Sequence, residues 1–424
     1  MKLRTVLSLL IFCAAGTLAA QNFNVAPQLR KHVEYLASDA LEGRAAGSQG
    51  ERKAARYVYD QLEQAGVVML TGVEGQDFKM ALESGEIASA NIVGIVDGSD
   101  PALRDEYIVV GAHIDAPGAN VMTVNGRKVL QIYPGADGNA SGTACLIELA
   151  RMVAAHSALF ARSVIFVGFG AGEQGNAGAW YFVNRAFTRI GDVKAMVNLD
   201  LLGRGGEQNP FRLYSTLPAG DLARLADITA ERPVVTPPIL SDGFFPQSDY
   251  LPFYEKGIPA FHFTTGISRE YHSARDVASL VQYKDMERSC NYIFYFLQTI
   301  ANGSIKEDKA VAQAAEPVYS PSDLDKRPQF FRGDERKFLR EWVYKYLKYP
   351  ASAVRDGVSG KVTVGFVIEK DGSVSDVEVV KSLDGRLDEE ALRVIKVSPK
   401  WTPGEIKGKA VRTRIVLPVE FRLK

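Results

Sequence analysis

Cysteine and histidine are rare in this chain. Its 424 residues include three cysteines and five histidines. So few cysteines exclude a disulfide-rich scaffold, which needs them at high density. Cys145 and Cys290 lie in apolar helical patterns, where either a disulfide or two buried free thiols would fit, and the sequence does not decide between them.

A surplus of charge of either sign is also lacking. The chain has 50 basic and 50 acidic residues. If the first 20 residues are removed, Lys2 and Arg4 go with them, and the net charge is then near −2. This balance does not favour a nucleic-acid partner, which would require a basic surface.

Long apolar runs are absent after residue 20. Before that point the chain has a basic start, an apolar stretch over residues 6–20 and two alanines ahead of Gln21. This is the pattern of a secretory signal peptide over residues 1–20, cleaved near Ala20. The stretch is shorter than the ~20 residues needed to span a bilayer. We therefore expect an exported soluble protein, periplasmic or secreted, without a transmembrane segment in the mature chain.

Short apolar segments alternate with helical patterns between residues 21 and 305. Two helices are expected between residues 29 and 65, ahead of Gly66. The alternation predicts an α/β domain, with a mixed and mostly parallel sheet covered by helices on both faces. The expected strands are 90–97, 107–113, 164–169, 195–199 and 260–264, and the later helices are 142–156, 177–187 and 286–300.

Composition changes after this domain. Residues 306–326 are rich in Ala, Pro, Ser and charge without periodicity, which indicates an exposed linker. Residues 327–424 then predict a small α+β domain. Its expected elements are a helix over 334–346, strands over 361–368 and 374–380 joined by an Asp-Gly turn, a helix over 389–397 and a last strand over 411–423.

Polar residues that can bind metals follow several of the predicted strands. Imidazole and carboxylate groups at one edge of an α/β sheet suit zinc with nitrogen and oxygen ligands. Each such residue alone is more often a helix cap or a paired polar group, whereas several in order favour a site. The remaining histidines are assigned to the surface (His32), a helix end (His156) and the core (His262). The site candidates are His113, Asp115, Glu173, Asp200, His272 and Asp276.

At these positions residues 29–300 resemble the zinc-dependent aminopeptidases of peptidase clan MH, which also contains the glutaminyl cyclases. The resemblance includes many motifs in order and implies the fold described above. The motifs are Leu36-Ala37-Ser38-Asp39-x-Leu41-Glu42-Gly43-Arg44, His113-x-Asp115, the Gly135 to Gly142 turn, the Phe169 to Gly178 segment, Asn198-Leu199-Asp200, Ser248-Asp249, Gly257-Ile258-Pro259 and Tyr271-His272 with Asp276.

The resemblance implies a set of metal ligands. His113 and Asp200 would bind one zinc ion, and Glu173 and His272 would bind the other. Asp115 would orient His113, as a carboxylate commonly does for a metal-binding imidazole. Asp249 and Asp276 would support the ligands or the substrate.

Two acidic positions of the family pattern are glycines here. The Asp that bridges the two zinc ions is replaced by Gly138, and the Glu that acts as general base is replaced by Gly172. Asp137 lies one residue from the bridging position and is a candidate substitute. Without the bridge each zinc keeps two protein ligands, whereas catalytic zinc normally has three. Loss of a general base removes typically ~10²–10⁴ in rate.

Two functions therefore remain open. One is a zinc metallopeptidase of the aminopeptidase type, acting on the N-terminal residues of peptides, with impaired or lost catalysis and weak or partial zinc occupancy. The other is a non-catalytic pseudo-peptidase that binds peptides or envelope proteins.

The last hundred residues resemble a second family, the C-terminal domain of TonB. Motifs that carry this resemblance are Leu347-Lys348-Tyr349-Pro350, Gly360-Lys361-Val362, Asp371-Gly372, Pro399-x-Trp401-x-Pro403 and Leu417-Pro418-Val419-x-Phe421. The resemblance implies a module that binds segments of outer-membrane transporters, or of other envelope proteins, by strand addition. The strand at 411–423 is the expected edge for such pairing.

Overall fold

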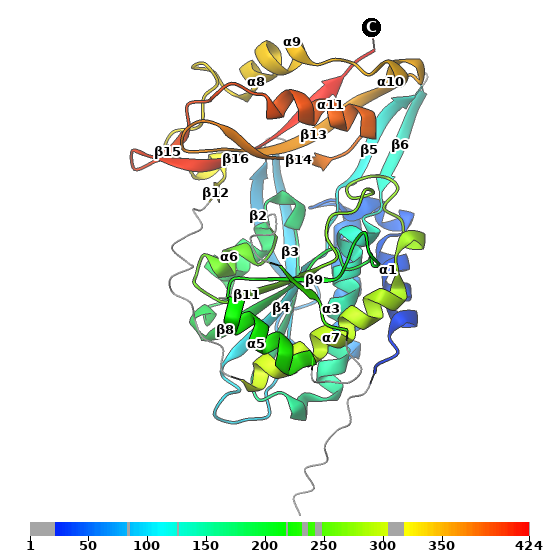
Figure 1. Cartoon of the computed structure of the whole chain (residues 1–424), viewed down its shortest axis with the longest axis vertical. Coiled ribbons are helices and arrows are strands. Elements are labelled where there is room, and N and C mark those ends of the chain that lie inside the picture. Colours follow the sequence, from blue (N-terminus) through cyan, green and yellow to red (C-terminus); the bar gives the residue numbers. More distant parts are fainter. Residues whose placement is uncertain are drawn as a thin grey trace, which may run out of the picture.

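A computed structural model describes residues 22–82, 85–124, 127–217, 219–230, 236–241, 248–303 and 318–423. The expected signal peptide and most of the predicted linker lie outside the described residues. The N-terminal domain, up to residue 303, forms the lower part of Figure 1, and the C-terminal domain, from residue 318, forms the upper part.

The N-terminal domain is built on a mixed sheet with parallel strands at its centre. Strands β4, β7, β8 and β11 run parallel, whereas β1, β2, β3 and β9 add antiparallel neighbours. The order is β1-β3-β7-β4-β8-β11-β9-β10, with β2 on β3. The bounds are β1 Val68–Met69, β2 Gln76–Leu82, β3 Gly85–Val96, β4 Tyr107–His113, β7 Ser163–Phe169, β8 Val193–Leu199, β9 Arg212–Ser215, β10 Ile239–Ser241 and β11 Ala260–Thr264.

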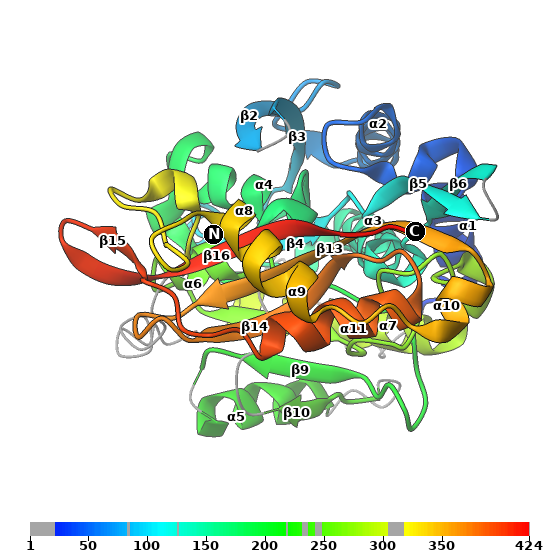
Figure 2. The same ribbon diagram turned by 90° about the horizontal axis from the view of Figure 1, so that it is seen from above.

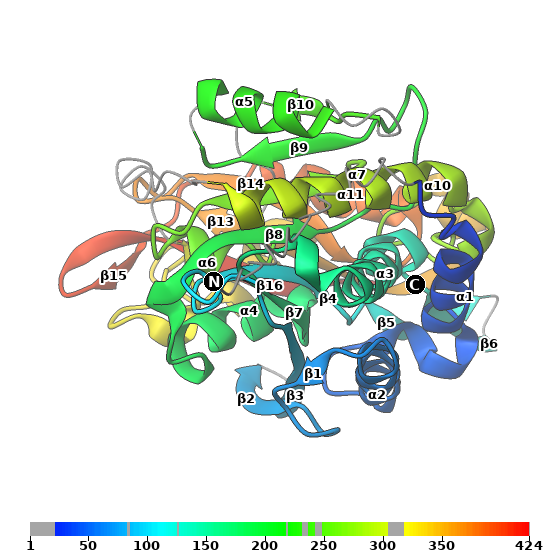
Figure 3. The same cartoon turned by 90° about the horizontal axis from the view of Figure 1, so that it is seen from below.

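Helices cover both faces of this sheet, which confirms the predicted fold class (Figure 3). Side chains of β4 alternate between the two faces. Ile108 and Val110 pack in the larger core, whereas Val109 packs in the smaller one. The larger core includes α1 Ala26–Leu36, α2 Gln49–Gln64, α3 Gly142–Ala155, α5 Ala219–Ala230 and α7 Tyr283–Asn302, and the smaller one includes α4 Ala177–Tyr181 and α6 Leu251–Tyr254.

The two cysteines of the N-terminal domain are free thiols buried in the larger core. Cys145 lies on α3 and Cys290 on α7. Burial raises the pKa of Cys290 well above its ordinary value. Of the two states that the sequence left open, the structure has the buried thiols.

One histidine was assigned wrongly from the sequence. His32 was expected at the surface, but it is 3% exposed. Its ring lies between the Tyr57 hydroxyl, 2.8 Å from Nδ1, and the Glu148 carboxylate, 3.2 Å from Nε2. A polar residue on the buried face of a helix is indistinguishable in sequence from a surface residue when its partners come from other helices.

The C-terminal domain is a curved sheet with helices on one face (Figures 1 and 2). Alternate residues of β13 and β16 point into its hydrophobic core, which also includes Trp401. Part of the predicted linker lies against this sheet, since Val318–Tyr319 pairs with β16. The bounds are β12 Val318–Tyr319, α8 Glu335–Phe338, α9 Tyr344–Tyr346, α10 Ala351–Arg355, β13 Val358–Ile368, β14 Val374–Lys381, α11 Gly385–Lys396, β15 Gly404–Ile406 and β16 Lys409–Phe421.

A hairpin of the N-terminal domain, absent from the sequence prediction, joins the two domains. Strands β5 Gly118–Val124 and β6 Arg127–Tyr133 pair with each other, and Val124 pairs with Val358 at the start of β13. Met122 packs in the core of the C-terminal domain. The Asn-Gly dipeptide at residues 125–126, a strong hairpin signal, would have indicated these strands.

Met122→Ala tests this connection. Met122 is 8% exposed, whereas its neighbour Val121 is 59% exposed. The buried side chain of Met122 should contribute about 2 kcal/mol to the free energy of unfolding, which is a common cost of replacing a buried methionine by alanine. We expect a lower urea midpoint for Met122→Ala, measured by tryptophan fluorescence, and no change in the midpoint for Val121→Ala. Equal midpoints for the two variants would contradict an anchoring role for the hairpin.

Candidate metal centre

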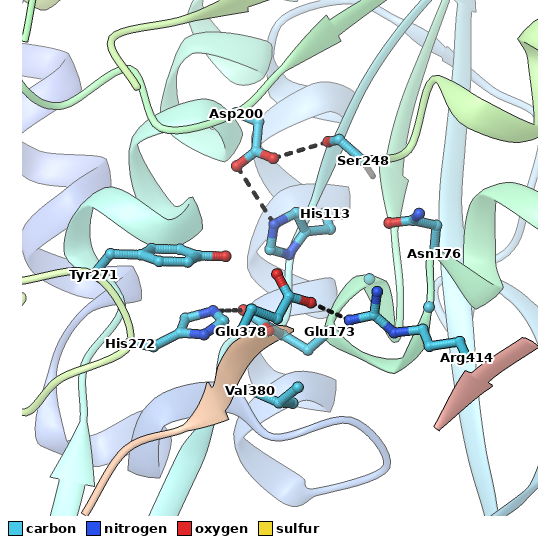
Figure 4. Close-up of a pocket in the computed structure, with 12 residues that line it drawn as sticks. His113, Glu173, Asn176, Asp200, Ser248, Tyr271, His272, Glu378, Val380 and Arg414 are labelled. Carbon is cyan, nitrogen blue, oxygen red and sulfur yellow. Dashed lines mark hydrogen bonds and ion pairs between the residues drawn. The ribbon is translucent and has the colours of Figure 1, made fainter. Parts of the chain in front are cut away.

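The predicted ligands come together at the carboxyl edge of the parallel strands. His113 is the last residue of β4, Glu173 lies in the 3₁₀ turn Gly172–Gln174 after β7, and Asp200 follows β8. His272 lies in the loop after β11. All four line one pocket of about 60 Å³ (Figure 4). A crevice at this edge is where open α/β sheets bind ligands.

The four ligand candidates form two pairs. His113 Nε2 lies 3.7 Å from Asp200 Oδ1, and His272 Nε2 lies 3.0 Å from Glu173 Oε1. Asp200 also accepts a hydrogen bond of 2.8 Å from the Ser248 hydroxyl. Within the part of the chain that the structure describes, no three His, Cys, Asp or Glu side chains are grouped so that they could hold one ion.

Within each pair, the carboxylate and the imidazole stabilise each other's charged form. Burial alone would lower the pKa of His113, but Asp115 and Asp200 raise that pKa well above its ordinary value. For His272, burial likewise opposes the charge and Glu173 raises the pKa. Burial opposes the charge of Asp200, yet His113 holds the pKa of this carboxyl below its usual value.

Asp115 joins the ends of two strands. This fully buried carboxylate accepts hydrogen bonds from the main-chain amides of Gly172, at 2.7 Å, and Glu173, at 3.0 Å. Its Oδ1 lies 3.4 Å from His113 Nδ1. Asp115 therefore faces the histidine that it was expected to orient and also holds the turn that carries Glu173.

The space beside Gly138 and Gly172 is filled by neighbouring side chains. A Cβ at residue 172 would overlap His113 Cβ and lie 2.6 Å from its Cγ. At residue 138 a Cβ would lie 2.9 Å from the ring of Tyr271, which stacks on His272 with ring centres 3.7 Å apart. Neither position accepts a side chain without movement of the site.

Asp137 and Asp276 serve the turn before α3. Asp276 accepts hydrogen bonds of 3.0 Å from the amides of Asp137 and Gly138. The Asp137 carboxylate accepts from the amide of Gly203 at 2.7 Å and faces Arg204 at 3.5 Å. The structure therefore does not bring Asp137 into the pocket as a substitute for the bridging residue. Burial raises the pKa of both carboxyls.

Arg44 also holds the turn before α3. This fully buried guanidinium donates to the carbonyls of Pro134 at 2.8 Å, Gly135 at 3.0 Å and Ile114 at 2.9 Å, and also to that of Leu36. Gly135 has a φ of +60°, which favours glycine. The first motif of the sequence thus positions the turn after β6.

Sequence reasoning missed the part of the pocket that comes from the C-terminal domain. Glu378 and Val380 of β14 and Arg414 of β16 line it together with the predicted ligands (Figure 4). In addition, His272 Nδ1 lies 2.8 Å from the main-chain carbonyl of Val379. No local pattern could have shown this, because it depends on how two domains dock.

Comparisons with known proteins identify a family for each domain. Residues 91–297 match the model of peptidase family M28, and residues 345–423 match that of the Gram-negative bacterial TonB protein C-terminal domain. Both resemblances seen in the sequence are thereby confirmed.

Two curated relatives each match part of this chain. The uncharacterized protein YfbL of Escherichia coli is 28% identical over 294 residues, 61% of this chain and 83% of YfbL. A probable zinc metalloprotease of Leptosphaeria maculans is 28% identical over 44% of this chain and 49% of its own length. The chain thus spans about half the length of that fungal relative.

Solved structures share the fold. The zinc aminopeptidase BSAP of Bacillus subtilis covers 65% of this chain and 95% of its own, with a TM-score of 0.51 and 15% identity. The glutaminyl cyclase of Porphyromonas gingivalis covers 64% of this chain and 97% of its own, with a TM-score of 0.52 and 17% identity. Residues 91–297 accordingly form a peptidase family M28 domain, and residues 345–423 form a TonB C-terminal domain.

Proposed function

We propose that the M28 domain is a peptide-binding unit that has lost ordinary two-zinc hydrolysis and keeps, at most, weak zinc binding. This proposal is based on which side chains surround the pocket and which positions beside it are filled. His113, Asp200, Glu173 and His272 surround it as two pairs, while the two positions that would supply the bridge and the base are closed by Tyr271 and His113.

The donor set fits zinc only in part. Zinc bonds to nitrogen and oxygen ligands are about 2.0–2.2 Å long, so two ligands of one tetrahedral ion lie roughly 3.3 Å apart. The 3.0 Å between His272 and Glu173 and the 3.7 Å between His113 and Asp200 are close to that spacing. Each pair could therefore face one ion, but a bridged pair of ions does not fit this set. Bound zinc would act as a Lewis acid on a carbonyl group.

The base is missing as well as the bridge. Glu173 contacts His272 and belongs to the ligand set, so it is not available to move the proton of a water molecule. Asp115 already accepts two amide hydrogen bonds. Loss of the base alone costs typically ~10²–10⁴ in rate. Binding without turnover follows.

Residual aminopeptidase activity is the second candidate. It is favoured by the intact support of the site, because Asp115 still faces His113 and Ser248 still binds Asp200. Peptides are the ligands in both cases.

The export expected from the N-terminal pattern and the TonB C-terminal domain support a place in the cell envelope, periplasmic or secreted. Among the residues that the structure describes, no helix is long and apolar enough to cross a membrane. One edge of β16 is paired with β13, and the other carries β12 and β15 only as far as Thr413. Residues 414–421 could add a strand from an outer-membrane transporter or another envelope protein.

Zinc binding and turnover distinguish the two candidates. We expect the purified chain to bind zinc weakly by calorimetry and to release no p-nitroaniline from leucine p-nitroanilide above background in added zinc. Glu173→Gln should weaken zinc binding at least tenfold, because one of two donors loses its charge. Glu63→Gln, on an exposed face of α2, is the control. Zinc-dependent turnover that Glu173→Gln abolishes would contradict the proposal.

Restoring the bridging carboxylate should require space as well as charge. Gly138→Asp alone should leave zinc affinity unchanged, since the new side chain meets the Tyr271 ring. Gly138→Asp with Tyr271→Ala should bind zinc more than tenfold tighter than Tyr271→Ala alone, because a third ligand is added. Gly172→Glu should lower the melting temperature through its overlap with His113. Tighter zinc binding by Gly138→Asp alone would show that Tyr271 does not close the site.

Asp249 should affect stability through its charge. It is fully buried, no described residue bonds its oxygens, and burial raises its pKa to about 7. Because the folded-state pKa is raised, its stabilising contribution is present below pH ~4 and is lost as the pH rises through 7. Asp249→Asn should match the wild type at pH 4 and exceed it at pH 8 by a few kcal/mol, at about 1.4 kcal/mol per pKa unit.

Urea unfolding at both pH values measures this difference. The exposed Asp227→Asn is the control and should follow the wild type throughout. A wild type and an Asp249→Asn variant with the same pH dependence would show that Asp249 is charged and stabilised in the folded protein.

A further inference from the structure

The face of the C-terminal sheet without helices lies over the pocket. Helices α8, α9 and α11 lie on the opposite face, away from the N-terminal domain (Figures 1 and 2). On β13, Val364 and Phe366 point into the core under these helices. Gly365 lies between them, where a Cβ would be 2.9 Å from Val380 and 3.2 Å from Arg414 Nη2. The absence of a side chain at residue 365 leaves room for Arg414 on the pocket side.

Three contacts fix this sheet above the pocket. His272 Nδ1 lies 2.8 Å from the carbonyl of Val379, and Lys381 Nζ donates to the carbonyl of Ala119 at 2.7 Å. The hairpin β5–β6 adds main-chain pairing with β13. The C-terminal domain therefore forms a roof over part of the pocket.

Charged side chains line both the floor and the roof of the pocket. The floor carries the carboxylates of Glu173 and Asp200 beside the two histidines. On the roof lies Arg414. Among the described residues that line the pocket, it is the only arginine, and none is a lysine. It pairs with Glu378, whose side chain is 42% exposed, whereas that of Arg414 is 20% exposed. Glu378 is therefore the more exposed partner of this ion pair.

We propose that Arg414 binds the C-terminal carboxylate of a short peptide, a di- or tripeptide, whose ammonium group faces Glu173 and Asp200. This inference rests on the proposed peptide binding and adds its length limit. A guanidinium group matches a carboxylate with two parallel hydrogen bonds. The carboxylate of the ligand replaces that of Glu378, so the ion pair on the roof is exchanged rather than lost. An internal segment of a longer chain has no such carboxylate and meets the roof.

Calorimetric titration of the full-length protein tests this assignment without requiring turnover. The probes are L-alanyl-L-alanine, its C-terminal amide and hexaalanine. The free acid should bind roughly 2- to 10-fold tighter than the amide, since the exchange of Glu378 for the ligand carboxylate gains about one net hydrogen bond. Hexaalanine should bind more weakly than the dipeptide.

Variants on β16 separate the carboxylate contact from general effects. Arg414→Met should weaken binding of the free acid roughly 2- to 10-fold and leave that of the amide unchanged. Arg414→Lys should fall between, because it keeps the charge but not the paired hydrogen bonds. Arg412→Met is the matched control, since Arg412 lies two residues earlier and bonds Glu369 instead of lining the pocket.

The outcomes distinguish this inference from the proposed function. Equal binding of acid and amide, or the same affinity after Arg414→Met, would overturn the role of Arg414 while peptide binding still holds. Hexaalanine bound as tightly as the dipeptide would overturn the length limit. If none of the three peptides binds, the proposed peptide-binding function itself fails, and this inference fails with it.

Discussion

The carboxylate of Asp115 is the interaction on which the pocket depends. This carboxylate is buried where β4 and β7 end. It accepts hydrogen bonds from the main-chain amides of Gly172 and Glu173, and it faces His113. A buried carboxylate is costly unless hydrogen bonds and positive charge compensate it. The turn after β7 and the imidazole at the end of β4 therefore stabilise the same group, and a ligand on one strand is placed relative to a ligand on the other.

This coupling explains why the two missing carboxylates do not leave simple vacancies. The turn at Gly172 is held so close to His113 that a Cβ there would overlap the imidazole stem. The ring of Tyr271 lies where a side chain at residue 138 would begin, and it stacks on His272. The packing around each glycine therefore involves a histidine of the pocket.

Local patterns predicted the N-terminal domain well, because its central strands are buried on both faces. The predicted strands 107–113 and 260–264 match β4 and β11 to the residue, and the polar residues after them reach one pocket. The prediction failed where the outcome depends on docking. The hairpin β5–β6 is stabilised by another domain, and His32 is buried by partners on other helices. Arg414 has no neighbour in sequence that indicates a site.

Strand β16 combines two properties that are usually separate. Its side chains reach the pocket at Arg414, whereas its main chain beyond Thr413 has no strand beside it on one edge in the described part of the chain. Side chains of a strand stand perpendicular to the sheet, and main-chain hydrogen bonds lie within it. A strand added at this edge would thus approach at right angles to Arg414 and need not displace it. Because the main-chain carbonyl of Val379 on β14 bonds His272, a shift of the sheet would also move His272 in the pocket.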